Sequence, residues 1–380
     1  MKKYFTGLLH IVSRAPYIYV ALFIAILSFT LPLVVDSYVF GPGMLDEEMR
    51  INRMILQTNL DGGAYDKAPD EVVQSARKDL ELIDGYFDNG ETNKRFGFAS
   101  RYYGRAVLQI ERGVLSGDLD VARGKELYCG ALTQLEEYTS FSSTRSMPAL
   151  IYLSFSLGSM PTPLLFAPVL IVIAGVAWAT RCGTVLHRSP VGYMQKIIAQ
   201  ALVCLIQIAV VFLGSVLIPL IAIAAVNGIG DPSFPVVYTQ SGALHITDLG
   251  SCTVQLLLLY TACAVFLSSL ALAITGASGY ARPGLLVDGL LVIVPLFPWY
   301  LMGSEISDML YRFLPTTYLP IGRVCGYVGV FPHADMAPAA HLDSVFGIFY
   351  LLFCAALLFG AACVTHKVAG TGILMKRQVV

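Results

Sequence analysis

The chain has 380 residues, of which 56% are hydrophobic and only 13% are charged, and its mean hydropathy is +0.67. A soluble domain of this length cannot bury so much apolar surface, so the composition excludes an ordinary water-soluble protein and indicates that lipid is part of its solvent. The eight cysteines include no CxxC pair, which argues against a zinc or disulfide framework, and the net charge of −1 is uninformative as a total.

The first 16 residues predict an amphipathic helix lying at the cytoplasmic membrane surface. Their charges are all basic, and four apolar residues recur at helical spacing: Phe5, Leu8, Leu9 and Val12. Residues 17–35 are uncharged and long enough to cross a bilayer once. A cleavable signal peptide is the alternative for this start. The apolar run is longer than a usual signal core, and no small-x-small cleavage site follows it, so we expect an uncleaved first span.

Residues 36–147 predict a small helical domain outside the cytoplasm. Residues 40–147 alone have a net charge of −5, in contrast to the apolar segments on either side. Three stretches show helical spacing of apolar residues, beginning near Pro69, Tyr103 and Val121. No alternating strand pattern competes with them in this block.

Five further spans are predicted within 148–366. An apolar stem at 147–158 precedes a span at about 162–180, because Pro161 and Pro163 interrupt an uncharged run that is too long for one upright crossing. The remaining spans are expected at 197–226, 251–274, 282–300 and 344–365, with outer loops at 227–250 and 303–343 and a cytoplasmic tail at 367–380. The predicted fold class is therefore an all-α integral membrane protein with six transmembrane helices and one helical domain between the first two.

The charges of the loops predict the orientation. The N-terminus, the segments 181–196 and 276–283, and the tail together hold ten Lys and Arg and no acid. On the opposite side, the segments 40–147, 227–250 and 303–344 hold 15 basic and 24 acidic residues. An excess of Lys and Arg in short loops marks the cytoplasmic side. Both termini are thus expected in the cytoplasm of a multi-pass protein of a bacterial plasma membrane.

Motifs for chemistry are sparse. The sequence contains no HExxH, GxSxG or P-loop motif. The glutamate pairs at 47–48 and 136–137 are typical of a charged helix surface, and a repeated His-x-Asp pattern, His333 to Asp335 and His341 to Asp343, is too short to predict a metal site. We expect no metal site, no catalytic residue and no nucleic-acid partner.

Asp288 is the acid nearest to the inside of a span. An ionisable residue there is a functional candidate for a proton relay or an ion site. Because it follows Arg282-Pro283 by about one turn, a second interpretation is that it stabilises the start of a helix while reaching water. This second interpretation is the one the sequence favours.

The layout resembles the type-2 permease family of ABC exporters, the membrane subunits of bacterial bacteriocin, peptide and drug export systems. The resemblance covers nearly the whole chain, from the amphipathic start through one span, an outer domain and five further spans. Three short stretches are also similar in sequence to this family: Leu186-His-Arg-Ser-Pro190, Asn227-Gly-Ile-Gly-Asp-Pro-Ser-Phe-Pro235 and Leu314-Pro-Thr-Thr-Tyr318. The outer domain at 36–147 is larger than in many members of the family.

The resemblance implies partners. ATP, with Mg²⁺, would be bound and hydrolysed by a separate soluble ATPase subunit, so the chain itself would be neither an enzyme nor a cofactor carrier. Two permease chains, identical or related, would enclose the path through the lipid. The loop between the second and third spans would dock on the ATPase through these residues: Val185, Leu186, Arg188, Ser189, Pro190, Tyr193, Met194 and Lys196. The loop charges alone would also be explained by orientation in the membrane.

Two other functions are compatible with the sequence. One is a polytopic sensor or other non-transport subunit that binds a ligand or partner through the outer domain. The other is a secondary carrier that uses Asp288, although the near absence of charge within the spans and the unequal halves of the chain argue against ion-coupled carriage.

Overall fold

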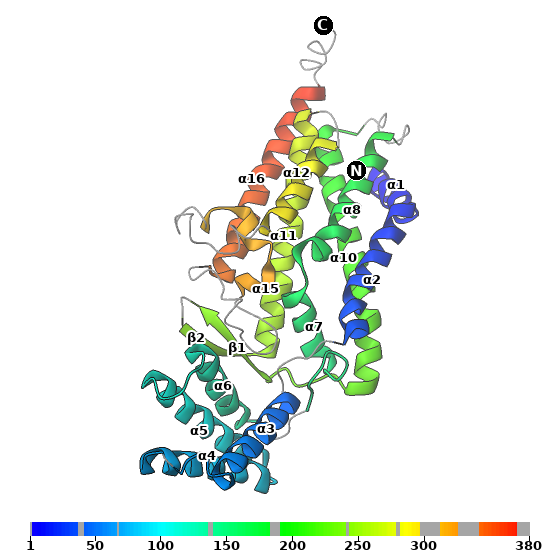
Figure 1. Cartoon of the computed structure of the whole chain (residues 1–380). Coiled ribbons are helices and arrows are strands. Elements are labelled where there is room, and N and C mark those ends of the chain that lie inside the picture. The colour runs from blue at the N-terminus through cyan, green and yellow to red at the C-terminus, as the bar shows by residue number, and fades with distance from the viewer. Residues whose placement is uncertain are drawn as a thin grey trace.

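A computed structural model describes residues 2–36, 42–66, 68–135, 140–182, 191–240, 243–278, 282–296, 312–325 and 342–370. Helices dominate these residues, and they form an elongated apolar bundle with a smaller helical domain at one end (Figure 1). The N-terminal helix lies at the opposite end of the bundle, which we call the N-terminal end; the other is the domain end.

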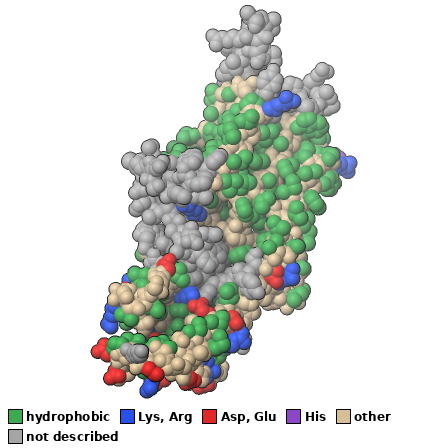
Figure 2. Space-filling model, in the orientation of Figure 1, with side chains coloured by type: hydrophobic (Ala, Val, Ile, Leu, Met, Phe, Trp, Pro, Cys, Tyr) green, Lys and Arg blue, Asp and Glu red, His purple; other side chains and the backbone are tan. Residues whose placement is uncertain are grey.

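Five helices in the described part of the chain are long and apolar enough to cross a membrane. They are α2 (Pro16–Val35), α8 (Thr162–Cys182), α10 (Tyr193–Asn227), α11 (Leu249–Ser278) and α16 (Ser344–Gly370). Hydrophobic side chains cover the face of the bundle seen in Figure 2, whereas charged side chains gather on the helical domain. The chain therefore has the architecture of a helical membrane protein, and five of the six predicted spans correspond to these helices.

The fifth predicted span in chain order, at 282–300, is not confirmed. In its place the chain forms α12 (Arg282–Ile293) and a single 3₁₀ turn, η1 (Val294–Leu296). A 12-residue helix rises about 18 Å, which is short of a hydrocarbon core roughly 30 Å thick. The 3₁₀ turn includes Pro295, whose ring cannot continue an α-helix without loss of a hydrogen bond. Residues 297–300 lie outside the described residues.

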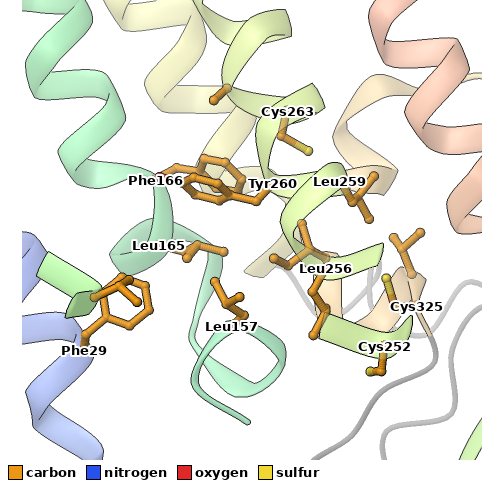
Figure 3. Packing of buried hydrophobic residues seen from close by; sticks show 14 of the residues in the cluster. Phe29, Leu157, Leu165, Phe166, Cys252, Leu256, Leu259, Tyr260, Cys263 and Cys325 are labelled. Atoms are coloured by element: carbon orange, nitrogen blue, oxygen red, sulfur yellow. The ribbon is translucent and has the colours of Figure 1, made fainter. Parts of the chain in front are cut away.

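The centre of the bundle is held together by a column of aromatic rings. Tyr260 of α11 stacks between Phe166 of α8 and Phe212 of α10, at ring-centre distances of 5.4 and 4.7 Å. Phe29 of α2 meets Phe212 edge-on at 5.9 Å, so the column joins four helices. Figure 3 shows three of these rings beside Leu157 and Leu165 of the surrounding core. Such contacts add to the burial of apolar area, and they fix how the four helices face one another.

One close contact brings α2 against α8. A Cβ atom placed on Gly175 would lie 1.9 Å from a ring carbon of Tyr17, so only a residue without a side chain lets the ring rest on the α8 backbone. The packing therefore depends on the glycine.

The N-terminal helix α1 (Lys2–Ser13) packs against α10 and α8. Its apolar stripe of Tyr4, Leu8 and Val12 is buried against the protein, whereas Lys2, Lys3 and Arg14 are exposed. The predicted amphipathic helix is present, but protein covers the apolar face that was expected to rest on lipid.

The described residues of the helical domain form four helices. α4 (Asp70–Asp88), α5 (Thr92–Glu111) and α6 (Leu119–Leu132) occupy the three predicted stretches. α3 (Pro42–Asp61) was not predicted, because its buried stripe is limited to Leu45 and Met49 after an N-terminal proline. Ile51, Met54 and Ile55 of the same helix are exposed, which blurs the helical period.

The predicted loop 227–250 contains a β-hairpin that the sequence analysis missed. β1 (Pro235–Gln240) pairs antiparallel with β2 (Ala243–Asp248), with Pro235 opposite Asp248. Both strands pack on α6. Phe234, just before β1, is buried between the rings of Tyr128 and Phe141, at 6.2 and 5.7 Å.

The remaining short elements lie near the domain end. α7 (Ala149–Ser159) is the predicted apolar stem, and it packs on α10 and α11. η2 (Pro315–Tyr318) and α15 (Ile321–Val324) precede α16, and α15 contacts both α7 and α11.

Candidate functional site

The first turn of α10 carries the described part of the predicted ATPase-docking segment. Tyr193 and Met194 begin the helix and are 48% and 55% exposed. The ammonium of Lys196 lies 5.9 Å from the centre of the Tyr193 ring, within the range of a cation–π contact. This turn thus presents an aromatic ring, a thioether and a cation together. The other predicted docking residues lie outside the described residues: Val185, Leu186, Arg188, Ser189 and Pro190.

Helix α1 lies beside this turn. Tyr4 is buried where α1 packs against α10. The exposed charges of α1 are basic, as is the exposed Arg282 at the start of α12. Within the described residues, this end of the bundle therefore carries cations and no carboxylate on its surface.

Asp288 lies inside the bundle on the second turn of α12. Its side chain is fully buried, and neither carboxylate oxygen has a hydrogen-bond partner among the described residues. The predicted access to water is therefore wrong. The reason lies in the tertiary structure, because α12 packs against both α8 and α11. A position near the start of a helix does not reveal that neighbouring helices bury the side chain.

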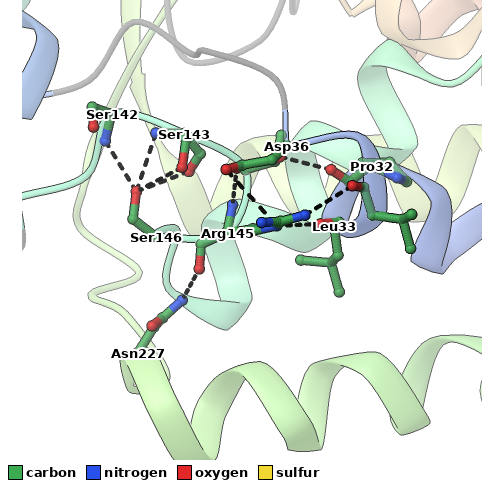
Figure 4. Close-up of polar contacts among 10 residues, drawn as sticks. Pro32, Leu33, Asp36, Ser142, Ser143, Arg145, Ser146 and Asn227 are labelled. Carbon is green, nitrogen blue, oxygen red and sulfur yellow. Dashed lines mark hydrogen bonds and ion pairs between the residues drawn. The ribbon is translucent and has the colours of Figure 1, made fainter.

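At the domain end, a polar clamp joins the end of α2, the segment before α7 and the end of α10 (Figure 4). The Arg145 guanidinium donates to the carbonyl oxygens of Leu33 and Val34 at 2.8 and 2.9 Å, and lies 3.8 Å from the carboxylate of Asp36. The Asn227 amide donates to the carbonyl oxygen of Arg145 at 2.6 Å. A cation placed on the last carbonyls of a helix satisfies orphan acceptors and opposes the helix dipole.

Sequence reasoning used Asp36 and Arg145 only as the limits of the charged block, yet they pair with each other. Their positions supplied the signal: each is the charge that directly borders a long uncharged run. When such runs are neighbouring helices, their flanking charges end at one membrane surface and can meet.

Ion pairs hold the helical domain together. Lys125 of α6 reaches Glu48 of α3 at 2.6 Å, and Arg105 of α5 reaches Asp79 of α4 at 2.6 Å. Glu47 pairs with Arg50 within α3. The first predicted surface pair, Glu47-Glu48, therefore has structural partners, whereas residues 136 and 137 lie outside the described residues.

Cys129 lies in the core of this domain beside Tyr128. Burial raises the pKa of the Cys129 thiol and that of the Tyr128 hydroxyl, so both groups remain protonated at neutral pH. A buried protonated thiol is a poor nucleophile. Cys129 and Cys325 are both free, so they do not pair.

A groove of about 840 Å³ runs over α5, between α4 and α6. Its lining includes Leu82, Phe98, Val107 and Leu108 together with charges of both signs. Arg101 lies over the Phe98 ring at 5.3 Å, so one rim of the groove combines an aromatic face with a cation. Such a surface can hold an amphipathic ligand, but no contact singles out one ligand class.

Metal chemistry finds no support in the part of the chain that the structure describes. It contains no cluster of three or more His, Cys, Asp or Glu able to hold an ion. Of the two His-x-Asp patterns, only Asp343 is described; its carboxylate accepts a hydrogen bond from the backbone of Val345 at 2.9 Å, at the start of α16.

Comparison with known proteins gave no match: no family model, no curated protein and no solved structure is similar to this chain. The structure itself shows an apolar bundle, a basic end with an exposed aromatic turn at Tyr193, and a helical domain attached to the opposite end. It also shows a buried carboxylate, Asp288, within the bundle.

Proposed function

We propose that the chain is the membrane-spanning permease subunit of an ATP-driven exporter and forms the translocation path with a second permease chain. In this proposal the N-terminal end of the bundle faces the cytoplasm of a bacterial cell and the helical domain lies outside it. A separate soluble ATPase supplies the energy, in keeping with the absence of a P-loop in the sequence.

The observation that carries the proposal is the exposed first turn of α10 at the basic end. Tyr193 and Met194 expose about half of their surface beside Lys196, and α10 runs from there through the bundle to the polar clamp. Exposed aromatic and thioether side chains are typical anchors of protein interfaces. A push on this turn would act along the longest helix in the described part of the chain.

The test is capture of the ATPase encoded beside this gene. We expect the parent chain, purified in mild detergent, to retain a P-loop ATPase from that neighbouring gene. Replacing Tyr193, Met194 and Arg188 together by Ala should lower the retained amount at least tenfold, since losing interface anchors costs about 2 kcal/mol or more. The readout is the ATPase-to-permease ratio by quantitative mass spectrometry.

The matched control replaces Val114 and Leu115, which are also exposed and apolar but belong to the helical domain. This control variant should retain the ATPase in full. Equal retention by both variants would refute docking at α10, and an absence of any P-loop partner for the parent chain would refute the exporter proposal itself.

The groove over α5 favours a second candidate function, a membrane sensor that binds a ligand through the helical domain. This alternative requires no ATPase. It predicts saturable ligand binding by the full chain that is lost when Phe98 and Arg101 are replaced by Ala and unaffected by the changes at Tyr193 and Met194.

A further inference from the structure

Among the described residues, no group hydrogen-bonds to or neutralises the carboxylate of Asp288. One turn earlier on α12, Gly284 approaches α11 so closely that a Cβ atom there would lie 3.0 Å from the carbonyl oxygen of Ala271. The two helices are consecutive and pack as neighbours, so the turn with Asp288 lies at the level of Ser268 on α11. Ser268 is 3.7 Å from the sulfur of Cys204 on α10, and Cys204 interacts electrostatically with Asp288.

Among the described side chains, the elements packed against α12 offer no counter-charge; the side chain of Arg181, near the end of α8, is not among them. Residues 162–180 of α8 and the three residues of η1 contain no ionisable side chain, and the facing stretch of α11, 264–275, offers only hydroxyls. The Ser268 hydroxyl donates to the carbonyl oxygen of Ala264 at 2.7 Å. Arg282, on the same helix, is exposed and lies about 9 Å along the axis from Asp288.

A second unsatisfied polar group lies nearby. The hydroxyl of Tyr17 on α2 is buried without a hydrogen-bond partner among the described residues, and Tyr17 interacts electrostatically with Cys204. Tyr17 of α2 and Asp288 of α12 thus each interact electrostatically with Cys204 of α10. Isolated buried polar atoms are costly, and an ionised carboxylate without a positive partner is the costliest of them.

We propose that Asp288 is the binding site for a small monovalent cation, either a proton or an alkali-metal ion, inside the membrane-embedded bundle. A cation would neutralise the carboxylate, which has no hydrogen-bond partner among the described residues. Because its oxygens are fully buried, a larger organic ion has no access to them in this conformation. The site is bounded by α12, a helix too short to span the membrane, and movement of α12 away from α11 would expose the carboxylate for exchange. The proposal does not depend on the exporter function.

Thermal unfolding of the purified full-length chain tests the site. A cation bound only to the folded state stabilises it by mass action. If the cation is a proton, the unfolding midpoint of the parent should fall by about 2 °C per unit as pH rises from 6 to 9. If it is an alkali-metal ion, 100 mM NaCl should raise the midpoint at pH 8 relative to 100 mM choline chloride.

Asp288→Asn should abolish whichever dependence the parent shows, because the amide binds neither ion as the carboxylate does. The matched control is Asp88→Asn, which changes an exposed acid at the end of α4 and should leave the dependence intact. If the parent and Asp288→Asn respond identically to pH and to Na⁺, the site does not exist.

A measurement on the native chain covers the case in which Asp288→Asn does not fold. A hydrophobic carbodiimide modifies protonated carboxyls within membranes, and peptide mass spectrometry locates the adduct. We expect an adduct on Asp288 that decreases at least fivefold either on raising the pH to 9 or on adding Na⁺. An adduct that neither condition changes, or no adduct at any pH, would mean that Asp288 does not exchange a cation.

Discussion

Asp248 shows how one side chain can end a strand and begin a membrane helix. It closes β2, and its Oδ1 accepts a hydrogen bond from the backbone nitrogen of Ser251 at 2.7 Å while Oδ2 accepts from the Ser251 hydroxyl at 2.8 Å. Ser251 lies three residues on, in the first turn of α11, so this is an N-cap. The backbone hydrogen bond and then the hydroxyl lower the pKa of Asp248.

The cap should therefore be sensitive to acid. A carboxylate whose pKa is lower in the folded chain stabilises the fold above its unfolded pKa, near 3.9, and loses that contribution as pH falls through the folded value. At pH 7, Asp248→Ala should cost about 1 kcal/mol locally. Hydrogen exchange in the first turn of α11, read by mass spectrometry, should then be about fivefold faster than in the parent.

At pH 3 the difference between the parent and Asp248→Ala should shrink. Asp248→Asn should keep most of the protection at both pH values, because asparagine caps helices nearly as well as aspartate. Equal exchange in the Asn and Ala variants at pH 7 would show that charge, and not capping geometry, protects this turn.

At the scale of the element, length and apolar composition were enough to predict five membrane-length helices. Five apolar runs become five long helices because a chain in lipid has to satisfy its own backbone hydrogen bonds. The same rule does not say which helices pack together or where a helix ends. The region of α12 was therefore predicted as a full span, although α12 is a 12-residue helix followed by a 3₁₀ turn at Pro295. The hairpin was missed although Val236, Val237 and Ile246 favour strands, because proline-rich and glycine-rich neighbours indicated a loop.

The approach of α2 to α8 gives a prediction for an element contact. Gly175→Ala should destabilise the chain by about 1–3 kcal/mol, because the added methyl displaces the ring of Tyr17. The measurement is the unfolding midpoint in detergent. Adding Tyr17→Ala to Gly175→Ala should recover part of the loss, since the small side chain leaves room for the methyl.

Gly214→Ala on α10 is the matched control. It also faces α2, but its added Cβ would lie 3.2 Å from the flexible end of Leu22, which can move aside. This control should be nearly neutral. A similar loss in both variants would mean that alanine is disfavoured by helix context and not by contact with Tyr17.

At the scale of the whole molecule, the helical domain is joined to the bundle by more than its two chain connections. The Arg145 clamp ties α2 to the start of α7, and Phe234 inserts the α10–β1 connection between Tyr128 and Phe141. The sequence predicted helices in this region but not this attachment, because no local pattern shows that a residue near 234 packs on one near 128. The same holds for Asp288: the sequence singled it out as an acid within a predicted span, but it did not predict that the side chain is buried.

Removing the Phe234 ring should loosen the domain without unfolding the bundle. Phe234→Ala replaces a buried aromatic side chain, which typically costs about 3–5 kcal/mol at the site. Limited proteolysis between residues 228 and 250 should become at least tenfold faster. The matched control, Ile246→Ala, alters a side chain of the same hairpin that is 41% exposed and should leave the rate unchanged. Equal rates in the two variants would exclude Phe234 as an anchor.

The position of Phe234 also sets an order of events during synthesis. Both walls of the gap, Tyr128 and Phe141, are synthesised before Phe234, the ring that fills it and that follows Phe141 by roughly 90 residues. At about 5–20 residues per second, the domain waits about 5–20 s with that aromatic gap open. Two more long helices, α8 and α10, must enter the bilayer before the gap can close. The nascent chain is thus most vulnerable to aggregation and proteolysis in this interval, and a chaperone that protects it would have to recognise an open aromatic gap.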